Sequence, residues 1–163
     1  MVATGLTGVY AETIPNFEVL TLVVFCAGVL LGAQDGLLVG AVTMLVYSLL
    51  NPYGAVHPLV TLSQVASEMI AGASGGWMAR AGLAGSAAGP RAVALGVAAL
   101  LLTAFYDLVT NLATGLLFGQ VGPTLLGGVP FSLVHIGSNV VLFAALGTPL
   151  VGVLARYRSR LSS

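Results

Sequence analysis

The segment Thr103-Ala104-Phe105-Tyr106-Asp107-Leu108-Val109-Thr110-Asn111-Leu112-Ala113-Thr114 places a carboxylate and several hydrogen-bonding side chains inside an apolar run. At helical spacing the polar members fall on one face: Thr103, Asp107, Thr110, Asn111 and Thr114. A carboxylate at membrane depth costs roughly 2.5–3.5 kcal/mol on insertion scales, so Asp107 is a candidate functional residue. The alternative is a polar seam that only joins this helix to its neighbours.

The composition around this segment is that of an integral membrane protein. Of the 163 residues, 58% are hydrophobic and 6% are charged, and the mean hydropathy is +1.05. These values lie outside the range of soluble globular proteins. The formal net charge is zero, which gives no indication of nucleic-acid binding. We therefore expect one integral membrane domain over residues 1–163, with Cys26 as a buried small apolar residue.

Apolar segments separated by glycine, proline and polar residues predict an all-α polytopic helical bundle with five transmembrane helices. The expected parts are an N-terminal segment (1–16), spans at about 17–32, 36–50, 59–78, 92–118 and 131–155, and a basic tail (156–163). Residues 51–58 and 119–130, which contain glycine and proline, are expected to be loops. The first span lacks a preceding basic region, so we expect it to be retained rather than cleaved as a signal peptide.

Glycine recurs every four residues through the first two spans, at Gly28, Gly32, Gly36 and Gly40. Small residues at this period let helix backbones approach closely, so we expect a packing face here. Orientation follows from the arginine residues, all of which lie in residues 80–91 or in the tail. We expect the protein to lie in the plasma membrane. The positive-inside rule then puts its C-terminus in the cytoplasm and the loop at 51–58 on the outer side of the membrane.

Three of the expected helices carry polar side chains on one face in their outer halves. Together with the loop at 51–58, they predict an outward-facing pocket for a small molecule. The candidate binding residues are Asn51, Tyr53, His57, Gln64, Glu68, Tyr106, Asp107, Thr110, Asn111, His135, Ser138 and Asn139. The inner halves of these helices hold almost no ionisable group, whereas a self-sufficient carrier places its site near the midplane. This asymmetry favours a capture subunit that needs other proteins to complete transport.

The sequence gives little support for an enzyme active site or for a metal-binding site. His135 and Ser138 lie on one helical turn without a nucleophile elbow or an assignable orienting acid, which argues against a serine hydrolase. His57, His135 and Glu68 stand at unrelated spacings, which is weak support for a metal site. We expect a protein that is not an enzyme and that uses no cofactor or metal.

Several segments resemble the substrate-binding (S) components of energy-coupling-factor transporters. They are Pro15-Asn16-Phe17-Glu18, Leu31-Gly32-Ala33-Gln34-Asp35-Gly36-Leu37-Leu38-Val39-Gly40-Ala41, Asn51-Pro52-Tyr53-Gly54, Ala71-Gly72 in a helix that also contains Gln64, and Tyr106-Asp107-Leu108-Val109-Thr110-Asn111. The resemblance covers residues 15 to about 155. It implies a small membrane protein that binds a vitamin or a related micronutrient from outside and docks on a transmembrane coupling subunit driven by two ATPase subunits.

The family has six helices, and the first of them contacts the coupling subunit. Only weakly apolar residues precede Pro15 here. We therefore expect either a five-helix variant or a start codon that has been assigned too late. Two other functions stay open from the residues themselves. One is a structural or assembly subunit whose polar faces lock helices together, and the other is a small proton-coupled carrier that uses Glu68 and Asp107.

Overall fold

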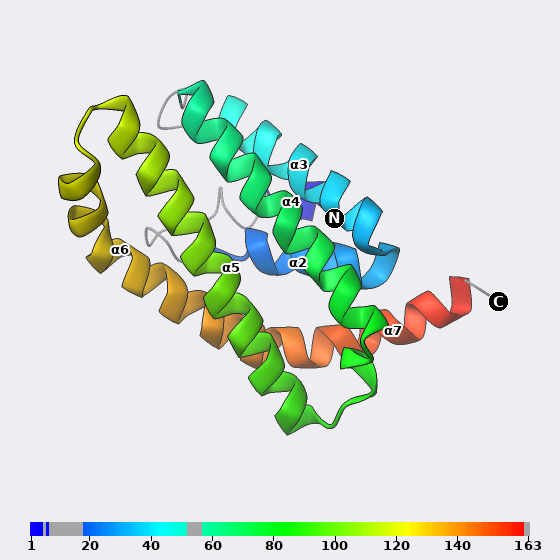
Figure 1. Cartoon of the computed structure of the whole chain (residues 1–163). Helices are drawn as coiled ribbons and strands as arrows, with labels where there is room; N and C mark the ends of the chain where they lie inside the picture. Colours follow the sequence, from blue (N-terminus) through cyan, green and yellow to red (C-terminus); the bar gives the residue numbers. More distant parts are fainter. Residues whose placement is uncertain (5, 7–17, 52–56, 162–163) are drawn as a thin grey trace.

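The computed structural model describes residues 1–4, 6, 18–51 and 57–161, and every regular element in them is helical (Figure 1). The predicted all-α class is therefore confirmed for this part of the chain. In chain order the elements are α2 (Leu20–Leu31), α3 (Ala33–Leu49), α4 (Pro58–Arg80), the 3-10 turn η1 (Leu83–Gly85), α5 (Ala88–Leu117), α6 (Val121–Leu142), the π-helical turn η2 (Phe143–Gly147) and α7 (Thr148–Leu161). The expected N-terminal segment, 1–16, lies mostly outside the described residues.

The helices pack as two groups. The first group is α2, α3 and α4 in mutual contact; the second is the pair α5 and α6, and α4 contacts α5 between the groups (Figure 1). The C-terminal ends of α3 and α5 and the N-terminal ends of α4 and α6 lie together, and we call this the Asn51 end. Arg80, Arg91 and Arg158 lie at the opposite, arginine end.

Glycine residues bring the backbones of α2, α3 and α4 into direct contact. A Cβ atom on Gly72 would overlap the carbonyl oxygen of Gly36, and a Cβ on Gly28 would overlap the carbonyl oxygen of Gly72. Any side chain at these positions would push the helices apart. The packing face expected from the glycine period is therefore confirmed at Gly28, Gly36 and Gly40.

Gly32 has a different role from the other members of that period. Its φ of 106° lies in the region that favours glycine, and it alone separates α2 from α3. The interruption expected at residues 33–35 is wrong, because α3 already begins at Ala33. The turn is tighter than expected because a single glycine can reverse the chain without a polar loop.

The expected loop at 119–130 is wrong, because α6 begins at Val121 and includes both of its proline residues. Pro123 stands in the first helical turn, where a backbone N–H has no intrahelical acceptor in any case. Pro130 lies inside the helix, and an interior proline is tolerated where neighbouring helices accommodate the freed carbonyl group. The turn from α5 is reduced to Phe118, Gly119 and Gln120, with φ of 65° at Gly119.

The expected last span, 131–155, is divided by the π-helical turn η2. Pro149 follows this turn and cannot donate a hydrogen bond to the carbonyl group of Ala145, which explains the local change in helical pattern. Beyond η2, α7 continues in a new direction toward the arginine end (Figure 1). There the Arg158 guanidinium donates a hydrogen bond of 3.2 Å to the carbonyl oxygen of Val29.

The apolar surface of the described residues supports a membrane location. Two helices, Ala88–Leu117 and the continuous stretch Val121–Arg158, are long and apolar enough to cross a bilayer. The helices α2 and α3 are apolar but shorter. Large side chains recur along the outer face of α5, where Val93, Leu101 and Leu116 are each at least 60% exposed. An exposed apolar stripe of this length is unfavourable in water and favourable in lipid.

We expect Gly72→Ala to destabilise the fold by about 1–3 kcal/mol, because the added methyl group must separate α4 from α2 and α3. The measurement is unfolding by SDS titration in mixed micelles. Gly127→Ala is the matched control, since a Cβ on Gly127 in α6 would meet no atom within 4 Å. This control should be neutral or stabilising by up to about 1 kcal/mol. Equal effects of the two substitutions would contradict the glycine-mediated contact.

Candidate functional site

A pocket with a volume of about 400 Å³ lies among α2, α3, α4, α5 and α6, toward the Asn51 end. It contains most of the predicted binding residues: Asn51, Gln64, Glu68, Tyr106, Asp107, Thr110, Asn111 and His135. Helical spacing explains this convergence. Glu68 follows Gln64 by four residues on α4, and Asn111 follows Asp107 by four residues on α5, so each pair shares a face.

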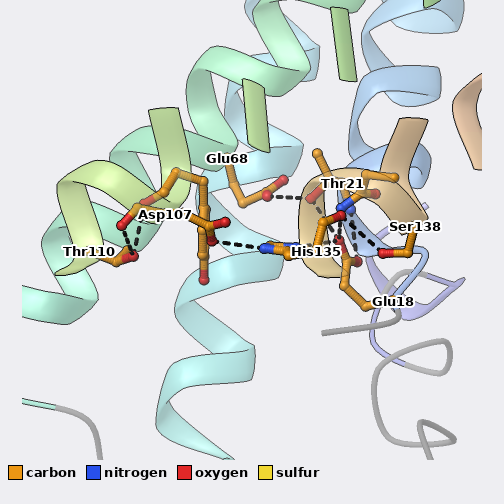
Figure 2. A network of polar contacts seen from close by, with 9 residues as sticks. Glu18, Thr21, Glu68, Asp107, Thr110, His135 and Ser138 are labelled. Carbon is orange, nitrogen blue, oxygen red and sulfur yellow. Dashed lines mark hydrogen bonds and ion pairs between the residues drawn. The ribbon is translucent and has the colours of Figure 1, made fainter. Parts of the chain in front are cut away.

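His135 is the centre of the polar network in this pocket (Figure 2). Its Nδ1 atom is 2.8 Å from Oδ1 of Asp107, and its Nε2 atom is 3.6 Å from Oε1 of Glu18. The imidazole therefore faces a carboxylate at each ring nitrogen, and it can donate to both only when both nitrogens carry a proton. The ring of Tyr106 meets the imidazole edge to face, with the ring centroids 5.7 Å apart.

A second set of contacts joins α2 to α4 through Thr21. The Thr21 hydroxyl oxygen is 2.9 Å from Oε1 of Glu18 and 2.8 Å from Oε1 of Glu68. Because the hydroxyl has one hydrogen, it can donate to only one of these carboxyl groups at a time. The backbone N–H of Thr21 also donates to Oε2 of Glu18, at 3.1 Å. Thr21 thus holds two acidic side chains close together inside the protein.

Several buried polar atoms of the site have no hydrogen-bond partner among the described residues. These atoms include Oε2 of Glu68, Oδ2 of Asp107 and Nε2 of His135. Glu68 is 2% exposed, so the missing partner is not replaced by bulk water. A buried polar group without a hydrogen bond costs about 1–3 kcal/mol, and more when it is charged. An arrangement of this kind is expected where a ligand or ordered water completes the hydrogen bonding.

The remaining predicted residues do not line the pocket. His57 is exposed and is the N-cap of α4, where its Nδ1 atom accepts a hydrogen bond from the backbone N–H of Leu59 at 3.2 Å. The Ser138 hydroxyl donates to the carbonyl oxygen of His135 one turn earlier on α6. Asn139 is fully buried, and its Nδ2 atom is 3.4 Å from Oε1 of Glu18. Tyr53 lies outside the described residues.

The pocket is also lined by residues that the sequence pattern did not indicate. They are Glu18, Leu20, Thr21, Met44, Tyr47, Gly128, Phe131 and Ser132. Glu18 had a usable signal, because an acidic residue directly before an apolar helix can accept hydrogen bonds from the first backbone N–H groups. Gly128 had no such signal in the sequence. A Cβ atom at Gly128 would meet the Asn111 side chain, so the role of this glycine depends on the packing of α5 against α6.

No group of three or more His, Cys, Asp and Glu side chains is placed to hold a metal ion in the part of the chain that the structure describes. Comparison of the chain with models of protein families, with curated proteins and with solved structures finds no match in any of the three. The function is therefore inferred from the pocket and from the pattern of the sequence.

The His135–Asp107 hydrogen bond should contribute strongly to stability, because each partner left alone is a partly buried polar group. In a double-mutant cycle, His135→Ala and Asp107→Ala should show a coupling free energy of about 1.5–3 kcal/mol. SDS titration in mixed micelles measures it. The pair His135→Ala and Thr124→Ala is the control, since the Thr124 hydroxyl donates to the carbonyl oxygen of Gln120, the residue that precedes its own helix. A coupling of similar size in both cycles would contradict a specific His135–Asp107 bond.

Proposed function

We propose that this chain is a membrane substrate-capture subunit of an ATP-driven importer, and that it binds a vitamin or vitamin precursor. The observation that carries the proposal is the pocket itself, with buried polar atoms that no described residue satisfies. A subunit whose polar faces only locked helices together would pair these atoms within the bundle. The cost of leaving Glu68 and Asp107 incompletely bonded is offset when a ligand supplies the partners.

The size and lining of the pocket fit a small organic molecule. Ligand pockets commonly have volumes of about 300–1,000 Å³, and this one falls within that range. Its wall combines apolar and aromatic side chains with convergent polar groups, which is the usual composition of a small-molecule site. Leu20, Met44 and Phe131 supply apolar surface, and Gln64 and Asn111 supply amide groups that can orient a ligand.

The proposed membrane placement is a multi-pass bundle with its pocket on the outer side and its C-terminus in the cytoplasm. The support is the distribution of charge: Arg80, Arg91 and Arg158 lie at the arginine end, whereas the pocket lies toward the Asn51 end. Arginine residues next to membrane helices favour the cytoplasmic side. A micronutrient would then enter from outside without crossing the bilayer first.

The interior beyond the pocket supports a capture subunit rather than a carrier that completes transport by itself. Toward the arginine end, α2, α5, η2 and α7 enclose an apolar core that includes Phe25, Val29, Leu95, Phe143 and Val151. Each of these side chains is fully buried. A proton-coupled carrier would need polar groups along this route. The proposed coupling subunit and its two ATPase subunits rest on the resemblance to S components.

A thermal-shift screen of the purified protein against vitamins and their precursors tests ligand binding. A compound present at 100 times its dissociation constant should stabilise the protein by about 2.7 kcal/mol. Asn111→Ala should weaken binding of that compound by about tenfold, because it removes an amide group from the pocket. Gln34→Ala is the control, since Gln34 is exposed near the arginine end. Unchanged affinity in Asn111→Ala would contradict the site assignment.

Labelling of single cysteine residues tests the orientation. In a Cys26→Ala background, Gln120→Cys lies at the Asn51 end and Ala87→Cys at the arginine end, and both positions are exposed. A membrane-impermeant maleimide added to intact cells should label Gln120→Cys only. Permeabilised cells should label both variants, which is the control for reactivity. Labelling of Ala87→Cys alone in intact cells would place the pocket on the cytoplasmic side and contradict capture from outside.

A further inference from the structure

We propose that the ligand is an organic cation with a flat ring, and that its positively charged N–H donor group binds between Glu68 and Asp107. This inference rests on the proposed function, because it names the chemistry of the molecule that the pocket would capture. It depends on three features of the site: the charge of the lining, the carboxyl oxygens of Glu68 and Asp107 that have no hydrogen-bond partner among the described residues, and the aromatic wall.

The pocket is lined by more acidic than basic side chains. Its described lining includes Glu18, Glu68 and Asp107 but neither lysine nor arginine, and His135 is the one basic residue among them. Even an imidazolium at His135 would leave more acidic than basic groups around the cavity. Charges interact more strongly in a partly buried site than in water, so a bound cation would be attracted and a bound anion repelled.

The two central carboxyl groups are each held by one oxygen and leave the other without a partner. Oε1 of Glu68 is bonded to the hydroxyl of Thr21, and Oδ1 of Asp107 is bonded to His135. The second oxygens, Oε2 of Glu68 and Oδ2 of Asp107, are buried and have no hydrogen-bond partner among the described residues. Both of these atoms are acceptors when the groups are ionised, and a ligand that bonds to them in that state supplies the donors.

Aromatic side chains extend the site beyond the carboxyl groups. Tyr47, Tyr106 and Phe131 line the same pocket, from α3, α5 and α6 respectively. Aromatic faces pack favourably against flat rings and attract cations through the negative charge of their π systems. The described side chains hold no metal-ligand group of three or more residues, which favours an organic cation over a metal ion.

Matched pairs of small molecules test this inference on the purified protein in detergent. The probes are pyridoxamine with pyridoxine, and benzamidine with benzamide; within each pair the cationic member has a neutral analogue of similar shape. Nicotinate is the anionic probe. Titrations followed by thermal shift should give at least tenfold tighter binding for the cationic member of a pair, and no binding of nicotinate.

Two variants link that preference to the carboxyl groups. Glu68→Gln keeps an oxygen that can accept from Thr21 but removes the charge, and it should weaken binding of the cationic probe by about tenfold or more. Asp107→Asn is the second variant, used if Glu68→Gln does not fold. The control is Asp35→Asn, which removes the same charge from an exposed position at the start of α3, and it should leave the affinity unchanged.

The outcomes separate this inference from the proposed function. Tighter binding of nicotinate or of the neutral analogues, or equal binding of both members of each pair, would overturn the cation preference and leave a ligand-binding subunit in place. An unchanged affinity in Glu68→Gln, or in Asp107→Asn where that variant replaces it, would overturn the assigned position of the charged group. Absence of a thermal shift with all five probes, while another micronutrient does bind, would also overturn the cation class. Absence of any response to the whole vitamin screen would remove both proposals.

Discussion

The backbone contact of α2, α3 and α4 at Gly72 is the constraint on which the site depends. Gly72 meets Gly36 of α3 and Gly28 of α2 with no room for a side chain. One turn before Gly72, the carbonyl group of Glu68 lies against Gly40 in the same way. Helices this close bring the Thr21 hydroxyl to 2.8 Å from the Glu68 carboxyl group. A wider spacing between these helices would break that hydrogen bond and leave the buried Glu68 carboxyl group without it.

The second half of the pocket comes from α5 and α6, and its geometry follows from a different contact. Gly128 lets the Asn111 side chain lie against α6, and one turn earlier on α5 Asp107 reaches His135. Glu18 then connects the two halves, because it contacts Thr21 on one side and His135 on the other. Among the described residues, one oxygen of Glu68 and one of Asp107 have no hydrogen-bond partner, which is the physical basis for proposing a ligand with donors.

The sequence predicted many of the residues that line the pocket but not all of them. Glu68, Asp107 and His135 were recognisable because ionisable groups are costly in apolar helices and therefore call for a specific role. Met44 and Tyr47 were not, since apolar and aromatic side chains are common on every face of such helices. The loop expected at 119–130 was wrong because glycine and proline do not end a helix when they fall in its first turn or face a neighbouring helix.

The sequence by itself determined the helical class, the apolar surface and the polar face of α5, because these depend on composition and on the period of one helix. Only the tertiary structure decided that Glu18 closes the network, that His57 lies outside the pocket, and which oxygens of Glu68 and Asp107 have no hydrogen-bond partner among the described residues. These features depend on distances between residues far apart in the chain, such as Thr21 and Glu68. Such distances are set by how closely the glycine-lined backbones pack, which no local pattern specifies.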